Sequence, residues 1–318
     1  MSPVLCNYYV TLRCNSRCVF CNIWKDKSKF YLKEQNLEQI KNNLMALKRL
    51  GVKVIDFTGG EPLLYPHLIG ALREAKKQGF YTTITTNCLL YPKYASELKG
   101  FVDKLQFSLE SADEKEYNKI RGVASYADVI KSIEIAKEKK QRIYLIHTVT
   151  DENFKSLPSL IKFAQDKKCT LILNPCFEYF ENDAISKSAA TDIKKYFSQP
   201  FVVSDLANIE LILDGGNNVQ NPVCKAISST IVISPDNFLL LPCYHHTTKK
   251  IKINNNLFEI YNSEEIKKLK ASEGKFQFCK NCTIHCYMRA SFYNNPFSKY
   301  FLLTAKTYCK YLREYFRK

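Results

Sequence analysis

The first 175 residues of the chain alternate between short strand-like runs and amphipathic helical patterns. Strands are predicted where β-branched and aromatic residues cluster, at Leu5–Leu12, Val52–Phe57, Tyr81–Thr86, Val102–Ser108, Ile143–Val149 and Thr170–Pro175. Helices are predicted between or after them, at Leu37–Leu50, Pro66–Gln78, Pro92–Leu98, Tyr126–Lys139 and Lys155–Lys167. Parallel strands need a crossover of this kind. The alternation therefore predicts an α/β fold with a parallel sheet, whose functional residues follow the carboxyl ends of the strands.

The pattern changes after Pro175. A helix is predicted at Asp183–Phe197, a short strand at Ile209–Leu213 and a turn-rich boundary at Asp214–Asn218. The next predicted elements are a β-hairpin, a short helix and a basic, aromatic helix, at Thr230–Leu241, Ser263–Lys270 and Phe297–Phe316. We therefore expect a first domain at residues 1–215, a small cysteine-bearing region at 216–290 and a C-terminal helix at 291–318.

Cys14, Cys18 and Cys21 form a C-x3-C-x2-C run just after the first predicted strand. Three thiolates this close in sequence can converge on one metal centre, because soft sulfur ligands favour iron–sulfur clusters or zinc. A structural zinc takes four ligands and a [4Fe–4S] cube has four irons. The three cysteines therefore leave one position of either centre without a cysteine ligand. Two simpler interpretations stay open from the spacing alone, a zinc knuckle completed by Cys6 and three unrelated buried thiols.

Two further features accompany the run, Phe20 directly before its third cysteine and Gly59–Pro62 (GGEP) at the end of the second predicted strand. With them, the run resembles the signature of radical S-adenosylmethionine (radical SAM) enzymes. The resemblance implies an open, partial (β/α)6 TIM-like barrel, which agrees with the six predicted strands. It also implies a [4Fe–4S] cluster whose open iron chelates S-adenosylmethionine. One electron then cleaves this cofactor to a 5′-deoxyadenosyl radical, which removes hydrogen from a substrate.

The resemblance assigns several cofactor-binding residues. It places Phe20 against adenine and puts Ser108 and Glu110 at the ribose or methionine part of S-adenosylmethionine. Arg121, expected in a loop, resembles the arginine that binds the cofactor's carboxylate, for which a guanidinium fork is suited. The simpler alternatives are packing for Phe20, an exposed polar strand end for Ser108 and Glu110, and a solvated loop position for Arg121.

The GGEP motif and the end of the third predicted strand complete this set. Gly59 and Gly60 would let the backbone approach a ligand closely. Glu61, or a nearby carbonyl, would accept a hydrogen bond from the cofactor's ammonium group, while Pro62 closes the motif. Asn87 would reach the cofactor from the third strand, unless it only caps that strand. Alone, GGEP is also compatible with an ordinary Gly-Pro turn.

Cys88 stands where the family commonly has a glycine after Thr-Asn. Cys176 likewise follows a predicted strand, the sixth, so both are candidate cavity thiols. Such a thiol can hold a substrate, donate hydrogen or simply pack, and packing is the favoured role. No catalytic residue is assigned, and Cys6, Cys169 and Cys309 are expected to be structural.

A second cysteine set follows in the C-terminal third, at Cys224, Cys243, Cys279, Cys282 and Cys286. It resembles the auxiliary-cluster extension, SPASM or the shorter Twitch, that follows many radical SAM barrels. A full SPASM domain has seven cysteines for two clusters, whereas five suffice for one complete four-cysteine site. The resemblance thus implies one auxiliary [4Fe–4S] cluster on Cys224, Cys243, Cys279 and Cys282, with Cys286 competing for the fourth place.

Zinc is the alternative for this second set, because the same thiolates would bind it. His245, His246 and His285 are further candidate ligands, although solvent-facing positions next to a turn are the favoured interpretation.

Cysteine content and net charge indicate where the protein works and which partners it has. The thirteen cysteines are interpreted as reduced thiols of a cytoplasmic protein, because no secretory signal and no run long enough for a membrane span is recognised. The net charge of +16 comes from lysines spread along the helices, which makes nucleic acid an unlikely partner. A basic face is suited to an acidic electron donor such as flavodoxin or ferredoxin.

The sequence therefore predicts a radical SAM oxidoreductase with one auxiliary cluster. The expected reaction is an oxidation or cross-link of a peptide side chain, or the dehydrogenation of a small molecule. The alternative is a zinc-stabilised nucleic-acid-binding protein without catalysis, in which GGEP and Arg121 would have no role.

Overall fold

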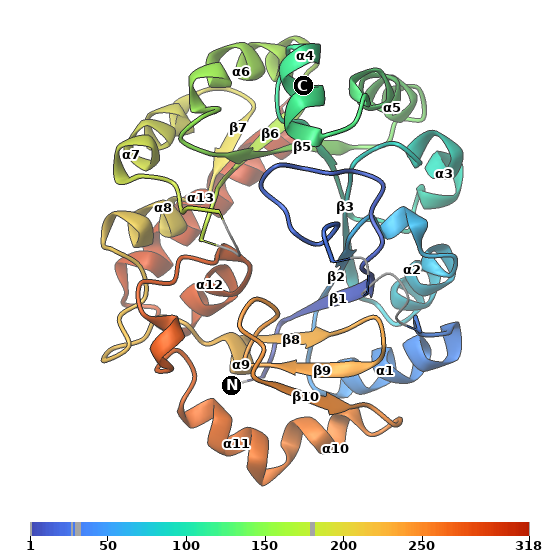
Figure 1. The fold of residues 1–318 in the computed structure, drawn as a ribbon, viewed down its shortest axis with the longest axis vertical. Helices are drawn as coiled ribbons and strands as arrows, with labels where there is room; N and C mark the ends of the chain where they lie inside the picture. The colour runs from blue at the N-terminus through green and yellow to red at the C-terminus, as the bar shows by residue number, and fades with distance from the viewer. Residues whose placement is uncertain (1, 27, 29–32, 179–181, 318) are drawn as a thin grey trace.

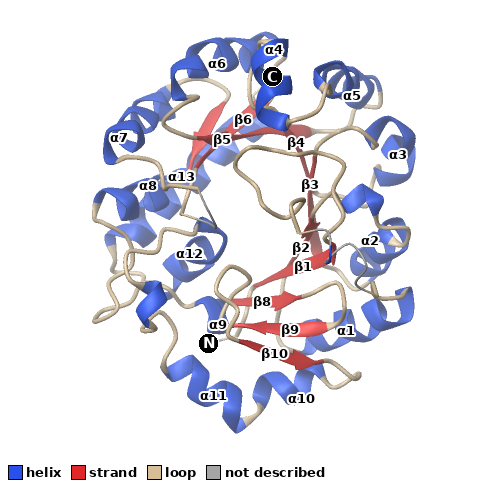
Figure 2. Cartoon of the chain, in the orientation of Figure 1, coloured by secondary structure: helices blue, strands red, loops and turns tan. Residues whose placement is uncertain are grey.

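One curved sheet surrounds the centre of the molecule (Figure 1). The computed structural model describes residues 2–26, 28, 33–178 and 182–317. Over these residues ten strands join in the order β10-β9-β8-β1-β2-β3-β4-β5-β6-β7. The strands from β8 to β7 in this order pair in parallel, and antiparallel pairing is confined to β8–β9 and β9–β10. Helices cover the outside of the sheet (Figure 2).

The six predicted strands are confirmed, with ends that differ from the prediction by at most two residues. They are β1 Leu5–Thr11, β2 Val54–Gly59, β3 Tyr81–Thr86, β4 Lys104–Ser108, β5 Ile143–Val149 and β6 Thr170–Pro175. The predicted helices between them are α1 Leu37–Arg49, α2 Leu68–Lys77, α3 Tyr91–Leu98, α5 Tyr126–Glu138 and α6 Leu157–Asp166.

One helix of this part, α4 (Glu114–Arg121), was not predicted. Asp113 caps its start by accepting a hydrogen bond from the backbone N–H of Glu116 at 2.8 Å. Gly122 ends it in the left-handed conformation, with φ +65°. Arg121 is therefore the last residue of a helix, and the prediction that it lies in a loop is wrong.

Beyond β6, the chain forms α7 (Lys187–Lys195), a seventh parallel strand β7 (Val202–Ser204) and α8 (Leu206–Leu213). The strand predicted at Ile209–Leu213 is thus part of a helix. Asp205 caps α8 by accepting from two backbone N–H groups. The run is apolar on almost every side, so its periodicity does not distinguish a buried helix from a buried strand.

The C-terminal third continues the same sheet. The predicted hairpin is confirmed as β8 (Thr230–Ile233) and β9 (Phe238–Leu241), and β10 (Lys249–Lys252) follows. Leu5 lies opposite Thr230, because β8 pairs in parallel with β1. The helices here are α9 Ala226–Ser229, α10 Leu257–Asn262, α11 Glu264–Ala271, α12 His285–Ser291 and α13 Lys299–Phe316.

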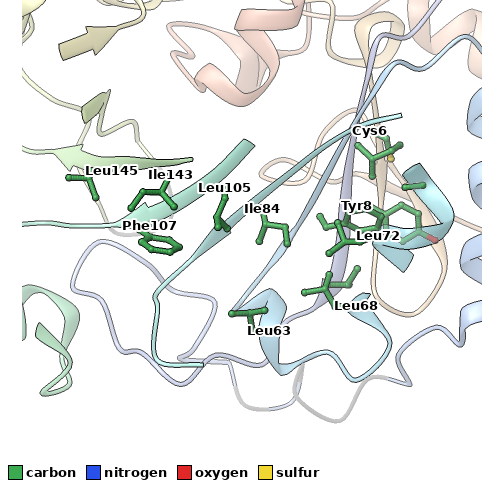
Figure 3. Packing of buried hydrophobic residues seen from close by; sticks show 14 of the residues in the cluster. Cys6, Tyr8, Leu63, Leu68, Leu72, Ile84, Leu105, Phe107, Ile143 and Leu145 are labelled. Carbon is green, nitrogen blue, oxygen red and sulfur yellow. The ribbon is translucent and has the colours of Figure 1, made fainter. Parts of the chain in front are cut away.

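The two faces of the curved sheet differ in character. Alternate strand residues such as Tyr8, Ile84 and Phe107 point outward and form the main apolar core with the helices (Figure 3). The residues between them, including Asp56 and Lys104, point inward and are partly exposed. The inner side of the sheet, here called the lumen, therefore carries many polar side chains.

Two helices close the lumen. α12 contacts α8 and α9, and lies between β7 and the C-terminal strands (Figure 1). α13 passes beneath the amino ends of the central strands, where Tyr311 stacks on Tyr144 at 5.3 Å between ring centroids. None of the helices in the described part of the chain combines the length and the apolar character that crossing a bilayer requires.

Candidate cofactor and metal sites

The predicted cluster cysteines share the loop that follows β1, which lies across the mouth of the barrel (Figure 1). Cys18 is buried, Cys14 and Cys21 are half-buried, and none is in a disulfide. Burial raises the pKa of Cys14 to about 11 and that of Cys18 to about 12, and each thiol is close enough to Cys21 for its charge to add to the shift. The three thiols therefore form one group.

Gly59 and Gly60 hold this loop in place. A Cβ atom on Gly59 would lie 1.9 Å from the carbonyl oxygen of Thr11, and one on Gly60 would lie 2.1 Å from that of Arg13. The N–H of Gly60 donates to Thr11 O at 2.9 Å, and the N–H of Glu61 donates to Arg13 O at 2.8 Å. The glycines thus allow the backbone to approach the cysteine loop, a partner that the sequence did not reveal.

The end of α4 fixes the other side of the loop. Arg17 N–H donates to Arg121 O at 2.9 Å, and Val19 N–H donates to Ile120 O at 3.0 Å. A Cβ atom on Gly122 would lie 2.4 Å from the carbonyl oxygen of Arg17. The cysteine loop is therefore held between two glycine-containing turns, and Arg121 is placed beside the thiols by backbone contacts.

Glu61 is buried and already has protein partners. Its Oε1 accepts from Leu63 N at 3.1 Å and from Thr86 Oγ1 at 2.8 Å, and its Oε2 accepts from Asn87 N at 2.8 Å. Burial raises the pKa of Glu61, although these hydrogen bonds act in the opposite direction. Its observed contacts join GGEP to the end of β3. The role of Glu61 toward an ammonium group stays a prediction.

Asn87 connects β3 to the cysteine loop. Its Nδ2 donates to Asn15 Oδ1 at 2.7 Å and to Ser16 Oγ at 3.0 Å. Its Oδ1 accepts from Leu89 N at 3.2 Å. This contact agrees with the alternative role of Asn87, which is to cap the end of the strand. Asn87 therefore supports the loop whether or not it also contacts a cofactor.

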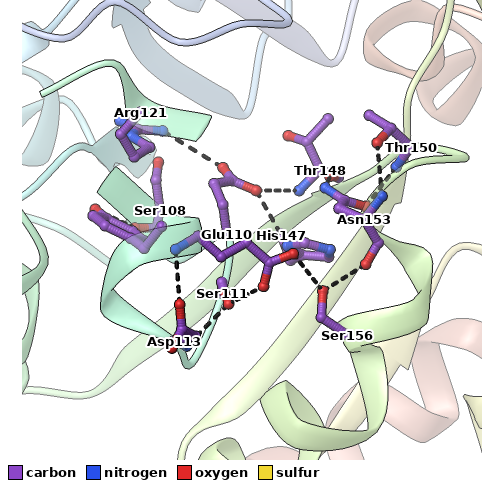
Figure 4. Close-up of polar contacts among 12 residues, drawn as sticks. Ser108, Glu110, Ser111, Asp113, Arg121, His147, Thr148, Thr150, Asn153 and Ser156 are labelled. Carbon is purple, nitrogen blue, oxygen red and sulfur yellow. Dashed lines mark hydrogen bonds and ion pairs between the residues drawn. The ribbon is translucent and has the colours of Figure 1, made fainter. Parts of the chain in front are cut away.

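A buried charge network lies beside the thiols (Figure 4). Glu110 Oε1 is 3.5 Å from Arg121 Nη1, and Glu110 Oε2 accepts from Thr148 N at 3.0 Å and lies 3.2 Å from His147 Nδ1. Arg121 is 5% exposed, and its Nε has no hydrogen-bond partner. Burial by itself lowers the pKa of Arg121, but the overall shift is upward because Cys18 and other acidic groups surround it. A buried guanidinium with an unused N–H is suited to bind an added carboxylate.

The remaining predicted cofactor residues lie around this group. Phe20 is partly exposed, and its carbonyl accepts from Asn182 Nδ2 at 2.6 Å. Ser108 is buried at the end of β4. Pro62 is the first residue of a short 3-10 helix, where its missing N–H costs nothing.

Cys88 does not face the lumen. It is completely buried in the main core and adopts φ +72°, a left-handed conformation that explains why glycine is common at this position in the family. Its predicted packing role agrees with this position, and its possible role as a cavity thiol does not. Cys176 is 7% exposed, and burial raises its pKa to about 11.

The second cysteine set is also brought together. Burial, and then Cys282, Cys279 and Cys243, raise the pKa of Cys224 well above its ordinary value. Cys286 is close to Cys243 and Cys282 as well, but the charge that affects it most is that of Asp56 in the lumen. Cys286 thus lies within electrostatic reach both of Asp56 and of two of the other thiols.

Asn217 organises this set, although sequence analysis predicted only a turn at this residue. Its Oδ1 accepts from Cys224 N at 3.1 Å, and its Nδ2 donates to Cys279 O at 3.0 Å. Its own N–H donates to Cys282 O at 3.0 Å. Gly216 permits the arrangement, because a Cβ atom there would lie 2.2 Å from the carbonyl oxygen of Asn281.

The histidines near these cysteines are packed among aromatic rings. The ring centroid of Phe177 lies 5.2 Å from that of His245 and 5.5 Å from that of His285. Burial lowers the pKa of His245 to about 3 and that of His285 to about 4. The expectation of solvent-facing histidines is therefore wrong for these two. Among the described residues, no three histidine, cysteine, aspartate or glutamate side chains are grouped so as to hold a single metal ion.

His147 and Asn217 were both missed in the sequence. His147 lies in an apolar strand and Asn217 in a run of turn residues, so neither has a local pattern that indicates a contact with another segment.

Comparison with known proteins shows the family of the part of the chain that contains the first site. Residues 8–164 match the Radical SAM superfamily. A probable GTP 3′,8-cyclase of Methanopyrus kandleri is 34% identical over 161 residues, which cover 49% of this chain and 51% of that protein. The GTP 3′,8-cyclase of Marinobacter nauticus is 31% identical over 165 residues, which cover 50% of this chain and 49% of that protein. The chain thus spans about half the length of these curated relatives. A probable GTP 3′,8-cyclase of Methanococcus maripaludis is 25% identical over 292 residues, which cover 85% and 94%.

Solved structures show the same fold. Streptococcus suis SuiB bound to S-adenosylmethionine has a TM-score of 0.66 at 18% identity, covering 89% of this chain and 69% of SuiB. The enzyme anSMEcpe with bound AdoMet has a TM-score of 0.67 at 17% identity, covering 99% and 100%. The matched sequence contains the cysteine loop, GGEP and Arg121, and the predicted partial barrel is confirmed. Residues 8–164 therefore form a domain of the radical SAM superfamily.

Proposed function

We propose that the chain reductively cleaves S-adenosylmethionine to a 5′-deoxyadenosyl radical and removes a hydrogen atom from a substrate. The observation that carries this proposal is the group of three free thiols, Cys14, Cys18 and Cys21, held beside the buried Arg121. These thiols fit a [4Fe–4S] cluster with one open iron, because they can supply three of its four ligands. Bound together, the cluster and S-adenosylmethionine would supply the radical chemistry, and the protein would orient them.

The residues around the thiols have distinct tasks in this proposal. Arg121 would bind the cofactor's carboxylate with N–H groups that Glu110 leaves unused, since Glu110 contacts Nη1 at 3.5 Å and Nε has no hydrogen-bond partner among the described residues. Thr148 N–H donates to the other oxygen of Glu110 and so fixes its orientation, and His147 Nδ1 lies 3.2 Å from the same oxygen. Phe20 would contact adenine, and Ser108 would reach the ribose or methionine part.

The substrate is proposed only by class. The first candidate substrate is a peptide, whose side chain would be oxidised or cross-linked, or a small molecule that would be dehydrogenated. The relatives named GTP 3′,8-cyclase favour a second candidate, a purine nucleotide. An acidic flavodoxin or ferredoxin is the proposed electron donor, because the net charge of +16 would attract it.

Anaerobic reconstitution tests the proposal directly. We expect protein with about eight irons, from two [4Fe–4S] clusters, and release of 5′-deoxyadenosine when dithionite and S-adenosylmethionine are added. Deuterated GTP and deuterated candidate peptides are then added separately. Transfer of deuterium from one of them into 5′-deoxyadenosine identifies the substrate that is attacked. Protein that binds zinc, contains no iron and releases no 5′-deoxyadenosine would contradict the proposal.

We also propose an auxiliary cluster on Cys224, Cys243, Cys279 and Cys282. The four thiols are close to one another, none is in a disulfide, and Asn217 bonds to the backbone of three of them. A cluster held there would accept the electron that a two-electron oxidation must discard.

The variant Cys279→Ala/Cys282→Ala tests this role. We expect it to lose about four irons, to keep releasing 5′-deoxyadenosine, and to form little or no oxidised product. Iron analysis and product formation are measured separately, with the exposed Cys309→Ala as the control. Normal product formation by the double variant would show that the second set is not an electron acceptor. One zinc in place of the missing iron in the wild type would show that the set holds zinc.

A further inference from the structure

The last helix, α13, turns polar side chains toward the protein. The residues that it buries are Thr304, Thr307, Lys310 and Glu314. Lys310 Nζ donates to Gln199 O at 2.8 Å, and Glu314 Oε2 accepts from the backbone N–H of Phe201 at 2.9 Å. Because these bonds hold the polar side against the protein, α13 cannot roll its other side inward without breaking them.

The outward side of α13 carries large apolar side chains, here called the apolar ridge. Its members are Leu302, Tyr308, Leu312, Tyr315 and Phe316, all of them exposed. Leu302 is 63% exposed and Phe316 is 74% exposed. Of the eleven large apolar side chains that are exposed among the described residues, seven lie between Tyr293 and Phe316. Single exposed apolar residues are normal on a protein surface, but a concentration of this kind marks an interaction surface.

Basic side chains surround the ridge. They belong to α13 or to the loops that lead into β2, β5 and β6, and are Lys53, Lys140, Arg142, Lys168, Lys306 and Arg313, all exposed. The guanidinium carbon of Arg142 is 3.8 Å from the ring centroid of Tyr315, so the loop before β5 borders the ridge.

Fewer acids are exposed in the same loops and at the helix ends beside them. They are Asp103, Glu138 and Asp166. Asp103 is 2.8 Å from Lys76 Nζ, and Asp166 is 3.5 Å from Lys162 Nζ, so both are already paired with other cations. This end of the barrel therefore presents an apolar ridge within a positive field.

We propose that this end of the barrel docks onto an anionic membrane surface, with the apolar ridge in the headgroup region. Leucine and phenylalanine side chains would reach the acyl boundary, and the rings of Tyr308 and Tyr315 suit the interface, where one end of the ring is apolar and the other wet. Lys306 and Arg313 would extend to the lipid phosphates. A second copy of the chain fits less well, because it would bring two positive surfaces together.

Docking in this orientation leaves the cysteine loop open to substrate and electron donor. That loop follows the carboxyl end of β1, whereas α13 crosses the amino ends of the strands, where Tyr311 stacks on Tyr144. The ridge and the cysteine loop thus lie at opposite ends of the barrel. α13 has 18 residues and is about 27 Å long, so the contact runs along the surface and does not cross it. The inference goes beyond the proposed function, because it requires neither cluster nor cofactor.

Co-sedimentation of the cluster-loaded protein with lipid vesicles tests the docking surface. One set of vesicles contains phosphatidylcholine alone, and the other contains equal parts of phosphatidylcholine and phosphatidylserine. We expect binding to the anionic vesicles, much weaker binding to the neutral ones, and a loss of affinity as salt is added, because salt screens the basic side chains.

Two double variants separate the apolar and the electrostatic contributions. Leu302→Ser/Phe316→Ser and Lys306→Glu/Arg313→Glu are each expected to weaken binding to the anionic vesicles by about tenfold or more. Met45→Ser is the control for the first, because Met45 is 52% exposed on α1. Lys41→Glu/Lys115→Glu is the control for the second, because it makes the same change of net charge at exposed positions of α1 and α4. Both controls should bind as the wild type does.

Thermal unfolding shows first that each variant is folded, and if the serine variant is not, the glutamate variant decides. The inference is overturned if the wild type binds neither kind of vesicle, or if the ridge variants bind as tightly as their controls. Light scattering follows self-association. A wild-type dimer that the serine variant loses, without vesicle binding, would assign the ridge to a second copy and overturn the inference. Release of 5′-deoxyadenosine is measured separately, so vesicle binding by a protein that cleaves no cofactor would contradict the proposed function alone.

Discussion

The variant Cys14→Ala/Cys18→Ala/Cys21→Ala is expected to release no 5′-deoxyadenosine and to lose about half of its iron. The three thiols lie on one loop that is held at both sides by glycine-containing turns, and the triple variant removes every cysteine of that loop. The auxiliary set is in a different part of the structure and should keep its metal. Iron content, the visible absorption of the clusters and 5′-deoxyadenosine release are the measurements.

Cys6→Ala is the matched control for this triple variant. The zinc-knuckle alternative required Cys6 as a fourth ligand, but Cys6 points to the outer side of β1 and is completely buried in the main core. Its replacement should lower stability without changing the iron content. Full cofactor cleavage by the triple variant would refute the proposed function, and loss of the first cluster in Cys6→Ala would favour the knuckle.

Arg121→Ala is expected to raise the dissociation constant for S-adenosylmethionine. A charge-assisted hydrogen bond contributes about 1.5–3 kcal/mol, which corresponds to roughly 10- to 150-fold in affinity. Arg121→Lys should recover only part of this loss, because an ammonium group lacks the planar fork of a guanidinium. Equilibrium dialysis of the cluster-loaded variants gives the dissociation constants.

Arg17→Ala provides the comparison for Arg121, because Arg17 belongs to the cysteine loop itself but is exposed. It should bind the cofactor as tightly as the wild type. Iron must be measured in both variants. Unchanged affinity in Arg121→Ala would reduce Arg121 to a structural residue, and loss of iron would mean that it supports the cluster and not the cofactor.

The strands and the thiol group could be predicted because both depend on short-range patterns. Strand runs such as Ile143–Val149 are apolar and bounded by turns, and the cysteine spacing itself brings the thiols together. The local reading failed where one pattern fits two structures. α8 is apolar on almost every side, so its part Ile209–Leu213 was mistaken for a strand. α4 is mostly charged and was not recognised.

The supports of the site could not be predicted, because they join segments far apart in the chain. Gly60 was expected to approach a ligand, but the group it approaches is Arg13 O, forty-seven residues earlier. Asn217 looked like any turn residue, and only the folded chain brings it to Cys224 and Cys279. Sequence thus indicated which residues carry the chemistry, while the residues that position them appeared only in the structure.

The pairing of β1 with β8 has a consequence for how the protein is made. Cys21 leaves the ribosome some two hundred residues before Thr230, which begins the strand that flanks β1. At 5–20 residues per second, this delay is roughly 10–40 s. Until β8 is added, β1 is an open sheet edge, which invites pairing with other chains, and the nearby thiols are open to oxidation. Oxygen exposure and iron supply during synthesis should therefore affect the yield of cluster-loaded protein more than the same conditions applied after folding.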